Sequence, residues 1–215
     1  MKLILTAVEE PLAAAWARHC GGLDCVEVVR GSILEVDCDA VVSPANSFGF
    51  MDGGIDALYY DHFYDHFGEA VELAVRRLIL EHYGGELLVG AADIVETASP
   101  AIPYLIAAPT MRVPMKLGDS VNAYLAARAV ILLMRFGRFR AGRLQGEAIA
   151  DHVRRVALPG LGTGVGGMPY ETCARQVRAA IDDFVLGGYR LPQSWAEASE
   201  RHQLLYTDRP QDLQR

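Results

Sequence analysis

Two glycine-dense segments of the sequence have the composition of phosphate-binding loops. The first, residues 43–56, reads SPANSFGFMDGGID, and the second, residues 158–169, reads LPGLGTGVGGMP. Glycine lets the main chain approach a ligand, adopt positive φ and point successive N–H groups into a concavity. Such a concavity at a helix N-terminus binds phosphate oxygens, assisted by the helix dipole. Because each segment follows an expected strand and precedes an expected helix, the pair predicts a diphosphate held from both sides.

Three alternatives to a diphosphate site account less well for the glycines. Tight turns alone would not need the five glycines of residues 160–167, since each surplus glycine costs roughly 0.5–1 kcal/mol on ordering. Gly162, Gly164 and Gly167 satisfy the G-x-G-x-x-G pattern of dinucleotide-binding folds, but fewer than fifty residues follow, too few for the remaining strands. A Walker A loop is excluded because the sequence has no G-K-S/T.

Two histidines have a spacing that could suit a metal. His62 and His66 are four residues apart, so one helix face could present both. However, the spacing comes from a tandem repeat, YDHF at 60–63 and again at 64–67, and no third ligand is evident. We therefore expect partly exposed helical histidines and no metal site.

A cluster of four arginines with interleaved phenylalanines occupies residues 135–143. Cations near a helix C-terminus interact favourably with the helix dipole, which is our main interpretation. A surface patch for a nucleic acid, another polyanion or a protein is the alternative. The formal net charge of −7 argues against a protein whose main role is to coat nucleic acid, because phosphate binding needs local positive charge.

The elements that must position these segments alternate between short β-branched runs and longer helical patterns, which predicts an α/β fold. Expected strands are residues 2–8, 26–33, 40–43, 87–95, 104–109 and 155–159. Expected helices are residues 10–20, 55–82, 171–185 and a segment from 119 or 120 to 136, with a last helix or strand in the tail. The continuously apolar runs 40–42 and 105–108 indicate strands covered on both faces, and hence a sheet between layers of helices.

The composition, with 51% apolar and 22% charged residues in a chain of 215, is that of one soluble domain with a sizeable core. The apolar run near the N-terminus is too short for a signal peptide, and no later run approaches the roughly 20 residues of a bilayer span. We expect a cytoplasmic protein with no membrane partner. The four cysteines are expected to be reduced and mostly buried in that compartment.

Three motifs in order resemble those of the macro domain family. They are DAVVSPAN at 39–46, DGGID at 52–56 and PGLGTG at 159–164. Members of that family typically read D-A-I-V-N-A-A-N, then G-G-G-V-D-G, and later P-x-I-S-T-G. The resemblance extends over about residues 26–185.

The resemblance implies a fold and a ligand class. The fold would be a three-layer α/β/α sandwich with a mixed central sheet of about six strands. Residues 1–215 would form a single domain, with a core at about 26–187 and a C-terminal tail, 188–215, packed on it. The ligand would be ADP-ribose or an ADP-ribosylated macromolecule, and no cofactor is implied.

The resemblance also assigns roles to individual residues. Asn46 resembles the asparagine that faces the distal ribose, and Asp56 the aspartate that positions or activates water in hydrolytic members, so these two are the catalytic candidates. The ligand-binding set that it implies is Ser32, Ile33, Ala45, Asn46, Gly53, Gly54, Ile55, Pro159, Gly160, Gly162, Thr163, Gly164, Val165 and Gly166.

The chain departs from the family pattern at several positions. Ser32 stands where the family often has an aspartate that accepts from the adenine amino group, and Gly166 replaces an aromatic residue that closes over the distal ribose. Phe48 or Phe50 is expected to supply a stacking surface instead. Ser43, Met51 and Asp52 are further differences. Together they indicate a divergent subfamily.

Two functions of different kinds remain open at this point. The domain could hydrolyse ADP-ribosyl linkages, with Asp56 and Asn46 setting a water against the anomeric carbon. Alternatively, it could be a non-catalytic reader of ADP-ribose or of another nucleotide diphosphate.

Overall fold

A computed structural model describes residues 1–67 and 70–211, with the side chains of 65–70 excepted. Its centre is a six-stranded sheet with the strand order β2-β1-β6-β3-β5-β4. The strands are β1 (Lys2–Ala7), β2 (Val26–Arg30), β3 (Ala40–Ser43), β4 (Asp93–Glu96), β5 (Tyr104–Ala107) and β6 (Arg155–Leu158). All neighbouring pairs are parallel except β4 with β5, which is antiparallel, so the sheet is mixed as expected.

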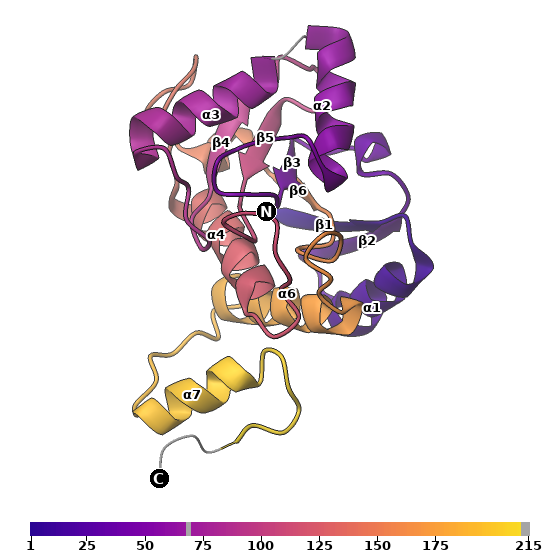
Figure 1. The fold of residues 1–215 in the computed structure, drawn as a ribbon, viewed down its shortest axis with the longest axis vertical. Helices are drawn as coiled ribbons and strands as arrows, with labels where there is room; N and C mark the ends of the chain where they lie inside the picture. Colours follow the sequence, from indigo (N-terminus) through magenta and orange to yellow (C-terminus); the bar gives the residue numbers. More distant parts are fainter. Residues whose placement is uncertain (68–69, 212–215) are drawn as a thin grey trace.

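Helices cover both faces of this sheet (Figure 1). They are α1 (Glu10–Cys20), α2 (Gly54–Phe67), α3 (Ala70–Tyr83), α4 (Asn122–Phe136), α5 (Ile149–His152), α6 (Tyr170–Phe184) and α7 (Trp195–Gln203). Leu3 and Leu5 of β1 pack in the core with α1, α4 and α6, whereas Ile4 between them packs in the core with α2 and α3. Because successive strand residues face opposite sides, each buried strand serves both cores. The α/β/α sandwich predicted from the sequence is therefore confirmed.

Two expected elements differ from the structure. The helix expected over residues 55–82 is two helices, α2 and α3, separated at residues 68–69, which lie outside the described residues. The strand expected over 87–95 is confined to Asp93–Glu96. Gly90, with φ of +96°, turns the preceding segment out of the extended conformation, and only an isolated bridge between Val89 and Ala91 remains.

The helix α4 begins at Asn122, later than the cap expected at residue 119 or 120. Its first turn is completed from α6, where the fully buried Gln176 accepts a hydrogen bond from the main-chain N–H of Tyr124 at 3.0 Å. The same side-chain amide donates to the carbonyl of Ser120 at 2.7 Å. Gln176 thus links the first turn of α4 to α6, a role the sequence pattern alone does not indicate.

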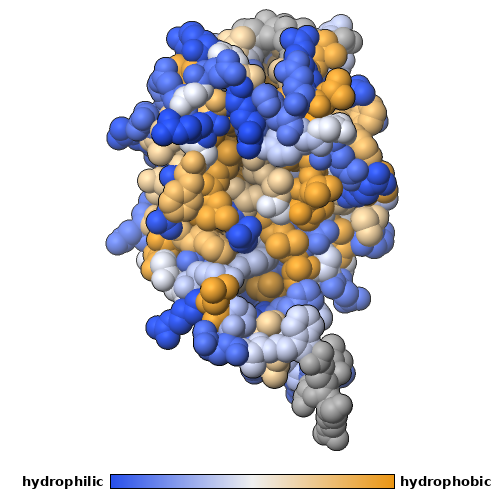
Figure 2. Space-filling model, turned by 90° about the vertical axis from the view of Figure 1, so that its left-hand side faces the viewer, coloured by the Kyte–Doolittle hydropathy of each residue, from blue (hydrophilic) through white to orange (hydrophobic). Residues whose placement is uncertain are grey.

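The tail carries α7 and is joined to α6 by ion pairs and by stacking of Tyr189 on Phe184. Arg175 pairs with Asp208 at 2.8 Å, and Arg201 of α7 pairs with Asp183 at 3.6 Å. Trp195, at the start of α7, is exposed. Seen from the side, apolar side chains gather across the middle of the molecule, between a hydrophilic upper end and the tail (Figure 2). Within residues 1–67 and 70–211, no helix has both the length and the apolar character needed to cross a membrane.

Candidate functional site

A cavity of about 370 Å³ lies at the carboxyl ends of the parallel strands. This edge is where open α/β sheets normally hold ligands, and the volume is within the usual range for a small-molecule site. The cavity is lined by the two glycine segments and by residues following β1, β2 and β5. Every residue proposed for the site from the sequence lies in this lining, including Asp56, Asn46, Ser32 and Ile33. What these residues bind stays a prediction.

The glycines of the second segment are not all required for the same reason. A Cβ on Gly160 would collide with the hydroxyl oxygen of Thr163, and one on Gly166 would collide with the carbonyl oxygen of Gly162, so packing of the loop itself requires these glycines. Gly164 is different, because a Cβ there would meet nothing within 4 Å and its φ is not positive. Neither packing nor backbone geometry explains glycine at this position.

The first segment contains a glycine of the same kind. Gly53, directly before α2, also has open space where a Cβ would lie and no positive φ. Both Gly53 and Gly164 line the cavity, one from each segment. A ligand that comes close to the main chain from both sides gives a physical reason for these two glycines.

The side chain of Asn46 is occupied within its own loop. Its Oδ1 accepts hydrogen bonds from the main-chain N–H groups of Phe48 at 3.1 Å and Phe50 at 3.3 Å, and its Nδ2 donates to the carbonyl of Phe50 at 2.7 Å. Although Asn46 lines the cavity as expected, its amide in this structure shapes residues 46–50.

Asp56, in the first turn of α2, lines the cavity with only 1% of its surface exposed. Burial raises the pKa of this carboxyl group to about 7, and a hydrogen bond with Ser43 opposes the rise only in part. Within the described part of the chain, its Oδ1 has no hydrogen-bond partner. A carboxyl group with a pKa near neutrality can exchange a proton with a bound water at physiological pH.

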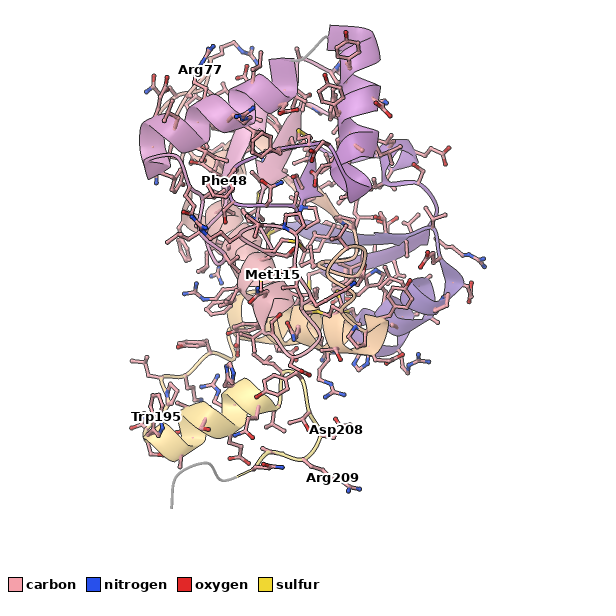
Figure 3. All side chains as sticks on the ribbon, in the orientation of Figure 1. Phe48, Arg77, Met115, Trp195, Asp208 and Arg209 are labelled. Carbon is pink, nitrogen blue, oxygen red and sulfur yellow. The ribbon has the colours of Figure 1, made fainter. Side chains whose placement is uncertain are left out.

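The two aromatic candidates of the first segment lie differently. Phe50 lines the cavity and is stacked by the guanidinium of Arg76 at 4.2 Å from the ring centroid. Phe48 is not part of the lining; it lies beneath α3, with Arg112 at 5.2 Å from its ring (Figure 3). Phe50 is therefore the one placed to offer a stacking surface.

Of the positions that depart from the family pattern, Ser32 uses its hydroxyl to accept from the N–H of Leu34 at 3.3 Å. Met51 is buried, while the exposed Asp52 lines the cavity.

Sequence reasoning missed parts of the cavity lining that lie on both sides of the glycine segments. Val8 and Glu9 follow β1, Tyr170 begins α6, and Thr110 and Met111 follow β5. The only available signal was that β1 and β5 end at the same edge of the sheet as the glycine segments.

A metal site would need several ligating side chains close together. Among the described residues, no three His, Cys, Asp or Glu side chains lie together in a way that could hold a metal ion. Of the histidine pair considered above, His62 is on α2, and the side chain of His66 lies outside the described residues.

The structure is a three-layer α/β/α domain with a cavity at the carboxyl edge of its sheet. Comparison with known proteins identifies the family. The model of the Macro domain matches residues 42–177, and the chain belongs to this family.

Similar sequences include an uncharacterized protein of Aquifex aeolicus, 33% identical over 165 residues, which cover 74% of this chain and 82% of the relative. An O-acetyl-ADP-ribose deacetylase of Salmonella gallinarum is 26% identical over 168 residues, covering 78% of this chain and 83% of the relative.

Similar solved structures are macrodomains as well. The DarG macrodomain of Mycobacterium tuberculosis superposes with a TM-score of 0.53 at 22% identity, covering 72% of this chain and 88% of that one. The Oceanobacillus iheyensis macrodomain with ADP has a TM-score of 0.55 at 17% identity, covering 73% and 74%. At these identities the likeness supports the fold.

Proposed function

We propose that this chain binds ADP-ribose, or an ADP-ribosylated macromolecule, with the diphosphate between the two glycine segments. The observation that carries the proposal is the pair Gly53 and Gly164, which line one cavity from opposite segments and have open space at the Cβ position. Membership in the macro domain family supports the same ligand, as do the solved macrodomains with ADP and with ADP-ribose.

The local electrostatics support an anionic ligand despite the acidic chain. Helix α2 begins at Gly54, which lines the cavity. The positive end of its helix dipole therefore lies at the cavity. Lys116 donates to the carbonyl of Val165 at 3.2 Å and so brings a cation beside the second segment. The exposed Asp52 opposes these contributions unless its side chain turns to solvent.

Filling the open space at Gly164 tests the binding proposal. Gly164→Val would place a branched side chain where the diphosphate lies, and we expect at least a tenfold weaker affinity for ADP-ribose, on the order of 1.4 kcal/mol. The matched control is Gly118→Val, because Gly118 also has open space and no positive φ but does not line the cavity. If the two variants bind ADP-ribose with equal affinity, the diphosphate does not lie at Gly164.

Hydrolysis of ADP-ribosyl linkages is the second function that we propose. The environment of the Asp56 carboxyl group favours it. Its carboxyl group is buried beside the cavity, its pKa is raised to about 7, and its Oδ1 is unpartnered within the described residues. In this proposal ionised Asp56 accepts a proton from a water that attacks the anomeric carbon of the distal ribose. The bond between that carbon and the acceptor group breaks, and the acceptor group leaves with the proton that Asp56 took up. The relative named O-acetyl-ADP-ribose deacetylase supports a hydrolytic activity in the same family.

Two measurements distinguish a hydrolase from a non-catalytic reader of ADP-ribose. Asp56→Ala should abolish release of ADP-ribose from a modified substrate while ADP-ribose still binds. If the wild-type protein releases nothing from ester-linked, arginine-linked and nucleic-acid-linked ADP-ribose, the enzymatic proposal fails and the reader remains. Tighter binding of a GDP-sugar than of ADP-ribose would instead favour a reader of another nucleotide diphosphate.

A further inference from the structure

One end of the cavity carries a carboxylate that the proposed function does not use. The strand order places β1 and β2 on one side of β6, and β3 and β5 on the other. The glycine segments follow β3 and β6, so the diphosphate site lies between these two strand ends. The cavity continues past β6 to Glu9, directly after β1, and to Ser32 and Ile33, beyond β2.

The surroundings of Glu9 suit a flat aromatic ring. Leu12, Ile33 and Val8 contribute apolar surface to the lining, and the ring of Tyr170 lies beside Glu9. Asn46 and Asp56 line the cavity from the segment after β3 and the start of α2, and β3 lies on the other side of β6 from β1. A ligand with a central diphosphate therefore places its base at the Glu9 end and its distal ribose at the Asp56 end.

The carboxylate of Glu9 is held by Tyr170 through one oxygen, and its other oxygen has no partner among the described residues. The hydroxyl of Tyr170 donates to Oε2 of Glu9. Among residues 1–67 and 70–211 this side chain has no second partner, and Glu9 makes no side-chain cap with α1. The neighbouring Glu10 is instead paired with Arg30 and is absent from the cavity lining. Of the two adjacent carboxylates, Glu9 is therefore the one that lines the cavity and has an oxygen, Oε1, without a partner among the described residues.

We propose that Glu9, positioned by Tyr170, reads the nucleobase by accepting a hydrogen bond from an exocyclic amino group. An ionised carboxylate has only acceptors, so it favours a 6-aminopurine and opposes a 6-oxopurine, whose carbonyl oxygen would face it. With Oε2 accepting from Tyr170, Oε1 is the oxygen without a partner among the described residues, and it can accept from the exocyclic amino group of a base. The hydroxyl of Ser32 is already engaged with Leu34 and is a weaker candidate. This inference rests on the proposed function.

The test compares ADP-ribose with its hypoxanthine analogue, inosine diphosphate ribose, in which a carbonyl oxygen replaces the 6-amino group and N1 carries a proton. Calorimetric titration of the wild-type protein should show at least about tenfold tighter binding of ADP-ribose, as for a hydrogen bond to a charged group. Glu9→Gln should reduce the ratio to roughly threefold or less, because an amide can also donate to a carbonyl. The matched control Glu10→Gln should keep the wild-type ratio.

The outcomes separate this inference from the proposed function. If ADP-ribose binds but the wild-type protein does not distinguish the two ligands, the role of Glu9 is wrong and the diphosphate site stands. The same conclusion follows if Glu9→Gln keeps the full ratio. If ADP-ribose does not bind the wild-type protein, both proposals fall together.

Discussion

The side chain of Ser43, the last residue of β3, lies beside the carboxyl group of Asp56, in the first turn of α2, and opposes the rise of its pKa. This contact joins the two ends of the first glycine segment. Asp56 is buried, and its Oδ1 has no hydrogen-bond partner among the described residues. The loop that faces the cavity is therefore closed by a carboxyl group whose protonation depends on pH near neutrality.

That carboxyl group should make stability depend on pH. Burial raises the pKa of Asp56 from 3.8 to about 7, so the folded protein keeps a proton that the unfolded chain loses. Its contribution should be most favourable below pH 4, decline as pH rises to about 7, and be lowest above that. Asp56→Asn should remove the decline and raise stability at pH 8, by on the order of a few kcal/mol.

Urea unfolding between pH 4 and 8 measures this effect. The exposed Asp52→Asn, on the same loop, is the control and should leave the pH profile of the wild-type protein unchanged. Parallel profiles for Asp56→Asn and wild type would show that this carboxyl group has an ordinary pKa.

Asn46 should prove important for the shape of the first segment. Asn46→Ala removes three hydrogen bonds to the main chain of Phe48 and Phe50 and should lower the free energy of unfolding, by about 1–3 kcal/mol. Asn46→Asp keeps an acceptor for the two N–H groups and should cost less. Chemical denaturation ranks the variants, and an alanine variant as stable as wild type would contradict the role assigned here.

Gln176 should stabilise the packing of α6 against α4. Gln176→Leu leaves the N–H of Tyr124 and the carbonyl of Ser120 without their buried partner, which should cost about 2–4 kcal/mol. Gln145→Leu, at an exposed position, is the control and should change stability by less than about 0.5 kcal/mol. Similar denaturation midpoints for the two variants would mean that water replaces the lost contacts.

Thiol reactivity should distinguish the four cysteines. Cys20, Cys38 and Cys173 are buried, and burial raises the pKa of each thiol, to about 12, 11 and 12 respectively. Cys25 is only partly buried. Because the thiolate is the reactive form, a thiol reagent at pH 8 should label Cys25 first in the native protein and all four after unfolding. Rapid labelling of Cys38 in the native protein would contradict the burial described here.

The sequence was most informative where local signals and tertiary structure agree. Residues 10–20 have a proline in the first turn and glycines beyond the end, and the helix has these bounds. The strand expected at 40–43, with its apolar run 40–42, is buried on both faces, as expected. Both glycine segments were recognised because glycine density is a local property with a direct physical use.

Contacts between segments that are distant in the sequence could not be predicted from residue types and their spacing. The first turn of α4 is completed by Gln176, 52 residues beyond Tyr124 in the sequence. Glu9 reaches the cavity because β1 lies next to β6, a neighbour more than 140 residues away. The internal use of the Asn46 side chain also depends on loop geometry rather than on residue type. These features arise from topology, which residue spacing does not encode.

Calorimetric titration of the wild-type protein with ADP-ribose at 25 °C tests the central claim most directly, with ADP, NAD and a GDP-sugar as comparison ligands. We expect ADP-ribose to bind with a Kd well below about 1 mM, corresponding to a free energy more favourable than roughly −4 kcal/mol, and more tightly than the GDP-sugar. Absence of ADP-ribose binding at 1 mM would contradict the assignment of this cavity.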